Sequence, residues 1–428
     1  MSIINDEYAV YLPAVSETFA NNLTKPIPNT RPIPNNFKIS DLEFWTKKNP
    51  YWHHPHFLHS IGQYKIGTIP DNAITIRGQT DGILFGDSAG FQIGKGTLKG
   101  LDTLQAGMSA DEACSAWRNS YETRLWILGW LETYTNYAMT IDMPLWVTRP
   151  EGKDSPFHLC SHEQLTQLTV ENLQFIDSHR QNRTKWLNVV QIEDCESTKK
   201  WWKAVKWFPC SGYAIGGRAL KSYDLTAILS TLLMMCDDHA FNAERSWIHM
   251  LGMSTTRSAI IFTAIQKALR IKATPDLRIS YDSASPLLLA GKYEKYVTLP
   301  EFGIDVEQWT IKAVACPQSR SYVGSSDLLP FKSPLADTLT LGHLNVNSDM
   351  YARNNFDWVT HLMLVHHNVW VYLESMQRAN NILFASDRSN APSIYKECVD
   401  LIGHVIGAEN WSSELDKHAS LFEAFAKS

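Results

Sequence analysis

Short apolar segments alternate with amphipathic segments over the middle of this 428-residue chain, and this alternation restricts its fold more than any other feature. The apolar segments of the regular part are residues 137–142, 186–192, 212–217, 247–252 and 278–283. Strands that are apolar along their whole length, with one helix between neighbours, are typical of a parallel sheet covered by helices on both faces. The alternation therefore predicts an α/β fold.

Two earlier segments extend the series. Residues 8–12 (YAVYL) and 82–88 (GILFGDS) are also strand-like, which brings the count to seven, close to the eight units of a (β/α)8 barrel. A doubly wound open sheet is the alternative, because periodicity does not show whether a sheet closes. We expect the barrel, because chemically useful residues recur at the C-terminal ends of many strands and do not gather at one switch point.

The chain after residue 283 departs from this regular alternation. Residues 284–360 contain many prolines and polar loop sequences, and we interpret them as an irregular insertion after the seventh strand-like segment. A helical part then spans about 361–428. Because no clean linker separates these parts, we expect a single domain over residues 1–428, a (β/α)8 TIM-like barrel with an insertion and C-terminal helices.

Composition and charge exclude several classes of protein. Hydrophobic residues make up 44% of the chain and charged residues 19%, which excludes a disordered chain and a coiled coil. The formal net charge of −5 excludes binding of nucleic acid through bulk positive charge, although not through a local patch. Since no run of about 18 apolar residues occurs, we expect no contact with a membrane. The seven scattered cysteines and the lack of a secretory signal predict a cytoplasmic protein, in the host cytoplasm if the source is viral.

The C-terminal ends of the strand-like segments carry carboxylates, an amide and glycines. These residues are Asp87 with Ser88, Asp142, Gln191, Gly216 with Gly217, and Asp282. In a barrel these ends meet on the face where sites are built. Carboxylates accept hydrogen bonds from the N–H edge of a purine-like base, an amide and backbone N–H groups donate to its carbonyl, and a further carboxylate can attack carbon. Each residue alone could be a turn or cap residue, so the hypothesis of a site depends on the whole set.

Six short blocks follow, in order, the signature blocks of a known family. They are FGDSAGFQI, YAMTIDMP, VVQ, GYAIGGRAL, HMLGM and ISYDSASP. Through these blocks, and through the later HNVWVYLESMQRANNIL, the chain resembles the queuine and archaeosine tRNA-guanine transglycosylases over about residues 73–384. The resemblance implies a (β/α)8 barrel with pentosyltransferase activity. Such an enzyme exchanges guanine for a 7-deazaguanine through a covalent aspartyl-glycosyl intermediate, and its chemistry requires no cofactor.

The resemblance also implies roles for the matching residues. Asp282 would be the nucleophile that attacks C1′ of the nucleotide, and Asp87 would contact the base and handle the proton. The residues that would frame the heterocycle are Ser88, Asp142, Gln191, Gly216 and Gly217. Arg218, directly after the glycine pair, would face the 7-substituent of the base or a phosphate.

Departures from the family bear on the nucleic acid that we expect as substrate. The tRNA enzymes carry a Pro-Thr-Arg type segment that contacts RNA after the nucleophile, whereas here Ser285 and Pro286 precede the apolar residues 287–290. This change, with DEYAVYLPAVSE and NPYWHHPHFLHS, makes the chain more similar to the DNA 7-deazaguanine transglycosylases of bacteria and phages. We therefore expect DNA and a free base of the preQ0 or preQ1 type as partners. The alternatives are a tRNA-guanine transglycosylase and a non-catalytic nucleic-acid-binding subunit.

The histidines and cysteines give little support for a metal site. The CxCxxC zinc triplet of the family is missing, and only Cys316 accompanies the matching His367. One thiolate and one imidazole do not make a closed structural site, so we expect no zinc here unless His343 and His361 converge with them. The histidines of HHPHFLHS (53–60) fit no standard metal spacing, and we expect them on a surface loop near the barrel mouth.

Overall fold

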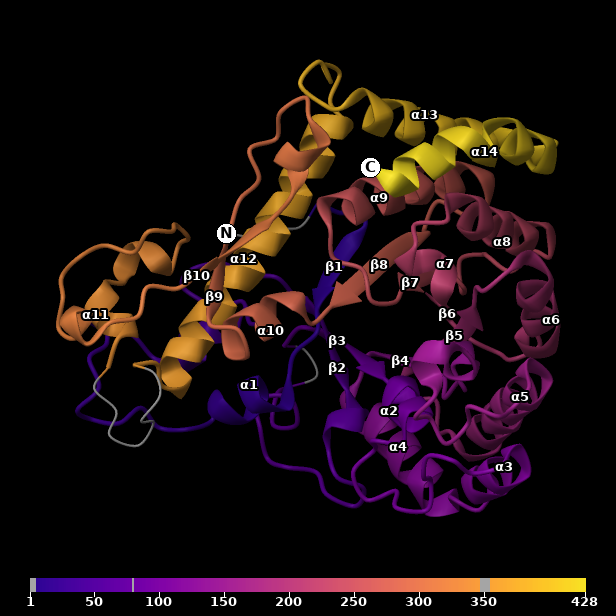
Figure 1. Cartoon of the computed structure of the whole chain (residues 1–428), viewed down its shortest axis with the longest axis horizontal. Coiled ribbons are helices and arrows are strands. Elements are labelled where there is room, and N and C mark those ends of the chain that lie inside the picture. Colours follow the sequence, from indigo (N-terminus) through magenta and orange to yellow (C-terminus); the bar gives the residue numbers. More distant parts are fainter. Residues whose placement is uncertain (1–4, 79–80, 347–354) are drawn as a thin grey trace.

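The computed structural model describes residues 5–78, 81–346 and 355–428, and its centre is a sheet of eight parallel strands (Figure 1). They are β1 (Val10–Pro13), β2 (His56–Ser60), β3 (Ile83–Asp87), β4 (Tyr137–Met139), β5 (Lys185–Gln191), β6 (Gly212–Gly216), β7 (Trp247–Met250) and β8 (Arg278–Ser283). The strands pair in the order β1-β8-β7-β6-β5-β4-β3-β2. A parallel bridge between Ala14, directly after β1, and Leu58 of β2 brings the two edge strands together. The sheet is thus nearly closed into a barrel, which confirms the predicted fold over the open-sheet alternative.

Helices lie between the strands along the chain and surround the barrel (Figure 1). They are α1 (Glu17–Asn22), α2 (Gly90–Lys95), α3 (Ala110–Arg118), α4 (Tyr121–Tyr134), α5 (His162–His179), α6 (Cys195–Val205), α7 (Arg218–Lys221), α8 (Leu225–Asp237) and α9 (Thr256–Lys272). The N-terminus of α3 shows why the sequence is helical there. Ser109 accepts a hydrogen bond from the Glu112 backbone N–H, and the Glu112 side chain accepts one from the Ser109 N–H, which satisfies two free donors of the first turn.

The eighth strand is formed by the segment that we expected on a surface loop. All five residues of β2 (HFLHS) are buried, so that prediction is wrong. The buried rings have partners on the backbone: His54 Nε2 donates to the Tyr11 carbonyl and His59 Nδ1 to the Val15 carbonyl, each at 2.8 Å. Burial lowers the pKa of His54 to about 3 and that of His59 to about 4, so both rings are neutral. A neutral, hydrogen-bonded imidazole is compatible with a core, whereas we treated these histidines as solvent-exposed groups.

Alternate residues of each strand point into the barrel. The residues of this interior cluster are Val10, Leu12, Leu58, Phe85, Met139, Leu187, Val189, Ala214 and Trp247. The residues between them point outward, as Tyr281 does, whose ring centroid lies 5.4 Å from that of Phe262 on α9. Because side chains alternate with a period of two, Asp87 shares the inward face with Phe85, and Asp282 shares it with Ser280.

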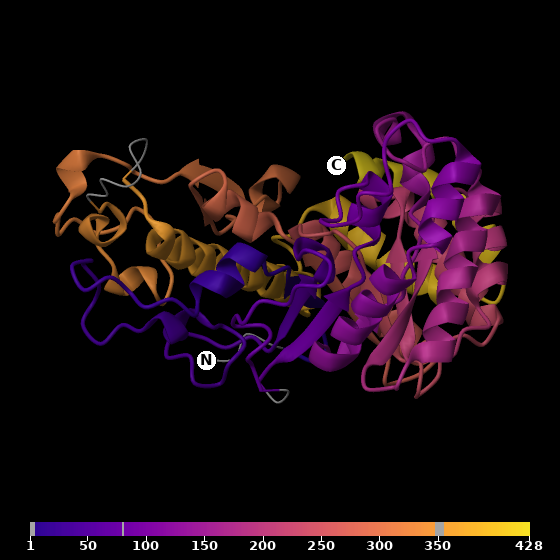
Figure 2. The ribbon, with the colours of Figure 1, turned by 90° about the horizontal axis from the view of Figure 1, so that it is seen from below.

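The chain after β8 forms the insertion and then three long helices. Its elements are α10 (Ser285–Gly291), the antiparallel pair β9 (Lys295–Thr298) and β10 (Lys312–Ala315), α11 (Leu341–Leu344), α12 (Trp358–Leu383), α13 (Ser393–Gly407) and α14 (Trp411–Lys427). Figures 1 and 2 show the insertion beside α12, to one side of the barrel, whereas α13 and α14 lie along the outer helices. The insertion follows the eighth strand and not the seventh, because β2 adds one strand to the expected series. In the described ranges, no helix combines the length and apolar character needed to cross a bilayer.

Candidate active site

The predicted carboxylates lie at the C-terminal ends of the strands. Asp87 ends β3, Asp142 follows β4, Gln191 ends β5, Gly216 ends β6, and Asp282 lies near the end of β8. Parallel strands bring these ends to one face of the barrel. Asp87 is close enough to Asp142 for its charge to raise the pKa of Asp142, and Asp282 has the same effect on Asp87. The structure therefore brings the three carboxylates into one site.

The Asp282 carboxylate is held in one orientation by two donors. Its Oδ1 lies 3.2 Å from Nε2 of His249 on β7 and accepts a hydrogen bond of 2.9 Å from the backbone N–H of Gly252. Gly252 has a φ of 76°, a left-handed conformation that suits glycine. Only 9% of Asp282 is exposed. Both donors engage the same oxygen, Oδ1.

His249 connects Asp282 to the barrel interior and was not among the predicted site residues. The Trp247 indole N–H donates to Ser280 Oγ at 2.8 Å, and Ser280 Oγ lies 2.9 Å from His249 Nδ1. An indole N–H can only donate, so the Ser280 proton is free to bond Nδ1, which leaves the His249 proton on Nε2, facing Asp282. The HMLGM block contains this histidine, but only the parallel pairing of His249 with Ser280 reveals its role.

Asp142 and Gln191 form a second buried pair. Gln191 Nε2 donates to Asp142 Oδ2 at 2.6 Å. Burial raises the pKa of Asp142 to about 7, the Gln191 hydrogen bond opposes this shift, and the charge of Asp87 adds to it. A Cβ atom at Gly90 would lie 2.7 Å from Asp142 Oδ1, so the glycine of DSAG allows the first turn of α2 to approach this carboxylate.

Asp87 lies at a sharp turn between β3 and α2. Burial raises the pKa of its carboxyl, a hydrogen bond with Ser60 opposes the shift, and the charge of Asp282 adds to it. The turn continues through Ala89, whose φ of 70° is uncommon for a residue with a Cβ atom. Ser88 is turned away, because its hydroxyl donates to the Thr140 carbonyl at 3.0 Å. Of the DS pair, only Asp87 therefore directs its side chain to the carboxylate site.

The glycine pair after β6 fits tightly, while Arg218 lies apart from the carboxylates. Gly217 has a φ of 110°, and a Cβ atom there would lie 2.4 Å from the Ile192 carbonyl oxygen. A Cβ atom at Gly216 would lie 3.3 Å from Gln191 Nε2. Arg218 lines a separate hollow of about 920 Å³ between α6, α8 and α14, to which neither Asp142 nor the other site carboxylates contribute.

The residues considered for zinc have other partners. His367 Nε2 donates to the Val297 carbonyl at 3.0 Å, and burial lowers the pKa of this histidine to about 4. Cys316 is buried, and burial raises the pKa of its thiol to about 12, which disfavours the thiolate that a metal needs. His343 bonds Thr340 instead, with its Nδ1 at 3.0 Å from the Thr340 N–H. These residues do not form a ligand set in the described part of the chain.

No protein-family model matches the sequence, and no curated protein matches it. The fold and the site therefore define the class of protein by themselves. It is a (β/α)8-barrel protein in which three carboxylates, the partly exposed Asp87 and the buried Asp142 and Asp282, meet at the C-terminal ends of the strands.

Proposed function

We propose that this protein is a DNA-guanine transglycosylase that exchanges guanine for a 7-deazaguanine base of the preQ0 or preQ1 type. The observation that carries the proposal is the unequal setting of the three neighbouring carboxylates. Asp282 accepts hydrogen bonds from His249 and Gly252, whereas burial raises the pKa of Asp87 and of Asp142. Neighbouring carboxyl groups in different environments can divide the roles of nucleophile and acid. The reaction itself is inferred from the similarity of the sequence blocks to those of the transglycosylases.

Exchange would proceed by two displacements at C1′. In the first, a carboxylate oxygen of Asp282 bonds to C1′ while the bond from C1′ to guanine N9 breaks, and the departing guanine takes a proton from Asp87. In the second, the incoming base gives its proton to Asp87 and attacks C1′ from the same face, releasing Asp282. Two inversions retain the β-anomer, as in retaining glycosidases. The target guanosine must leave the stack to reach carboxylates at the ends of the barrel strands.

Asp142, Gln191 and the backbone at Gly217 would recognise the base. An ionised Asp142 would accept hydrogen bonds from the N–H groups of a guanine-like edge. In the free protein Gln191 already donates to Asp142, so base binding would redirect one of these two side chains. Gly217 itself packs directly on the Ile192 backbone, where a Cβ atom would lie 2.4 Å from the carbonyl oxygen, so any side chain at this position would displace the end of β6.

Base affinity is expected to weaken as the pH falls below about 7. The pKa of Asp142 is raised to about 7, so below this pH the carboxyl becomes neutral and loses its ability to accept two N–H donors. If binding requires the charged form, affinity falls by up to about tenfold for each pH unit below that value. Calorimetric titration with guanine between about pH 5 and 8 measures the effect. Asp142→Asn should bind weakly at every pH, and a wild-type affinity that stays constant down to the lowest pH would contradict the role.

Loss of the His249 ring should slow the chemical step more than it weakens binding. His249→Leu removes the donor that fixes Asp282 Oδ1, and a slightly misplaced nucleophile can cost about 10²-fold in rate. We expect this loss in single-turnover exchange, with the affinity for guanine unchanged. His239→Asn, which removes an exposed imidazole elsewhere, is the matched control. If His249→Leu changed affinity and rate equally, a general structural role would explain it better.

A substrate-swap assay tests the proposed function. Purified protein is incubated with preQ0 or preQ1 and either guanine-containing DNA or tRNA, and nucleoside mass spectrometry follows incorporation of the base. Incorporation into DNA supports the proposal. Incorporation into tRNA alone keeps the chemistry and changes the substrate polymer. If neither nucleic acid is modified and no covalent adduct appears on a denaturing gel, the proposal fails.

A further inference from the structure

Two histidines and one glutamate converge where α13 meets α14. His404 lies on α13, and Glu414 and His418 lie one turn apart on α14. Nε2 of His404 is 3.1 Å from Oε2 of Glu414, and Nε2 of His418 is 3.6 Å from the same oxygen. The three donor atoms all lie within 4.8 Å of one another. No second group of three or more such side chains comes together this closely within residues 5–78, 81–346 and 355–428.

The spacing of these donors suits a small divalent ion. Zinc binds imidazole nitrogen at about 2.0–2.1 Å and carboxylate oxygen at about 2.0–2.2 Å, so neighbouring ligands of a tetrahedral site are roughly 3.4 Å apart. The two distances to Glu414 Oε2 lie on either side of this value. The spacing of Glu414 and His418 by four residues places both on one face of α14.

The surroundings leave the site accessible. The side chains of His404 and His418 are 60% and 39% exposed, and that of Glu414 is 19% exposed. Lys417 pairs with Oε1 of Glu414, so Oε2 faces the two rings. Solvent can reach the cluster and supply a fourth ligand, which three protein ligands leave open.

We propose that His404, Glu414 and His418 form a binding site for a divalent transition-metal ion of the zinc type. The site is separate from the carboxylates at the strand ends and does not depend on the proposed reaction. Imidazole and carboxylate donors suit zinc, and the geometry has no sulfur ligand that would favour softer ions. The bound ion bridges α13 and α14.

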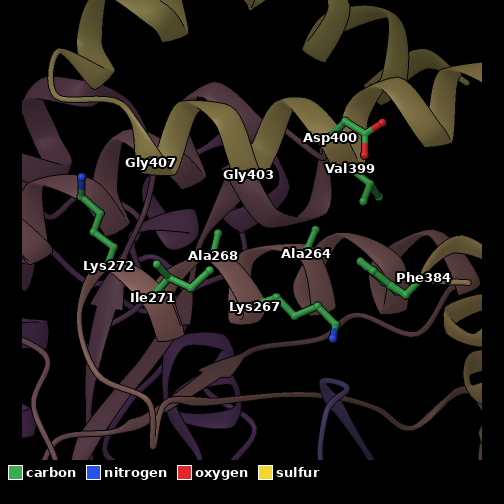
Figure 3. Close-up of a pocket in the computed structure, with 10 residues that line it drawn as sticks. All are labelled: Ala264, Lys267, Ala268, Ile271, Lys272, Phe384, Val399, Asp400, Gly403 and Gly407. Atoms are coloured by element: carbon green, nitrogen blue, oxygen red, sulfur yellow. The ribbon is translucent and has the colours of Figure 1, made fainter. Parts of the chain in front are cut away.

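A metal bridge would hold α13 and α14 together on the outside of the barrel helices. On its other side, α13 faces α9 across a groove of about 410 Å³, in which Gly403 and Gly407 lie opposite the small residues Ala264 and Ala268 (Figure 3). Beside this groove α13 packs on α9 and buries large side chains, among them Ile402, Val405 and Ile406. A metal bridge from His404 to α14, which packs on α8, would add one further connection within this helical layer.

Calorimetric titration of the chelator-treated full-length protein with Zn²⁺ tests the proposal, with Co²⁺ absorption as a second reading. We expect one ion per chain and visible bands typical of tetrahedral cobalt. His404→Gln and His418→Gln should each weaken binding by at least about tenfold, since the loss of groups that only support a ligand already costs 10–100-fold. Lys417→Gln and His239→Asn keep all three ligands and should bind as the wild type does.

Two outcomes would contradict the proposed metal site. If the wild type takes up no Zn²⁺, or if the His404→Gln/His418→Gln double variant binds it as tightly as the wild type, the site does not exist as proposed. Circular dichroism of each variant checks that the fold is intact, which is expected because both histidines are largely exposed.

Discussion

Asp282→Asn is expected to reduce base exchange by at least about 10⁴-fold, the scale seen when a member of a nucleophilic catalytic unit is removed. Asparagine has nearly the same shape and can still accept hydrogen bonds from His249 and Gly252. It has no negative charge with which to attack C1′, so the glycosyl ester cannot form. The measurement is nucleoside mass spectrometry for exchange, together with a denaturing gel for the covalent adduct.

Two comparisons make this result specific. Asp87→Asn should also slow exchange, but it keeps the nucleophile, so traces of covalent adduct should remain detectable. The affinity of Asp282→Asn for guanine should stay near that of the wild type, because Asp142 and Gln191 are intact. An Asp282→Asn protein that exchanges bases at an undiminished rate would remove Asp282 from the mechanism.

Arg31→Ala is expected to lower the free energy of unfolding by about 3–5 kcal/mol, the cost of breaking a buried ion pair by removing one partner. The Arg31 guanidinium donates from Nε and Nη2 to the two carboxylate oxygens of Asp357 at 2.9 and 3.0 Å, and its side chain is only 3% exposed. It also donates to Thr360 Oγ1 at 2.9 Å. Asp357 caps α12, so the substitution would leave a carboxylate that is only 12% exposed without its charged partner at the start of that helix.

Arg388→Ala is the matched control. Arg388 makes the same two-pronged contact with Asp400, at 2.8 and 3.0 Å, but these side chains are 30% and 60% exposed. An exposed pair of this kind is worth at most about 1 kcal/mol. Denaturant unfolding followed by tryptophan fluorescence measures both variants. Equal losses of stability would show that burial does not distinguish the two pairs.

The same pair adds a dependence on pH. Burial alone would raise the pKa of Asp357, but the hydrogen bonds and charge of Arg31, with the bonds of Thr360, hold it below its ordinary value. The folded protein therefore binds this proton more weakly than the unfolded chain does. The stabilisation is present above the ordinary carboxyl pKa of about 4 and is lost as the pH falls through the lowered pKa. In Arg31→Ala, this part of the acid sensitivity should disappear.

The strands that could be predicted from the sequence are those whose residues are apolar on both faces. Five regular segments and two earlier ones were predicted in this way, and each overlaps a strand of the barrel. β2 was missed because it carries His56 and His59, whose burial depends on partners that the local sequence does not show. His59, for example, is satisfied by the Val15 carbonyl, 44 residues away. A polar residue is not recognisable as part of a core until its partner is known.

Some residues of the candidate site could likewise be predicted from the sequence, and others could not. Asp87, Gln191 and Asp282 could be placed because each stands at the end of a recognisable strand. His249 lies within a strand, and its contact with Asp282 follows only from the register of β7 against β8. Arg31 lies 326 residues from Asp357, in a proline-rich segment typical of a surface loop, so nothing near it in the sequence indicates an ion pair.

The pairing of the first strand with the last has a consequence for the order in which the chain is assembled. Leu12 stands opposite Asp282 in β1 and β8, so translation must pass residue 282 before β1 can meet its partner. Contacts between residues so far apart in sequence form late, because closing a long loop costs entropy. Until then β1 has an unpaired edge that could join another chain. The proposed nucleophile therefore takes its place only when the final strand has been made. Nascent chains that end before β8 would lack a finished barrel.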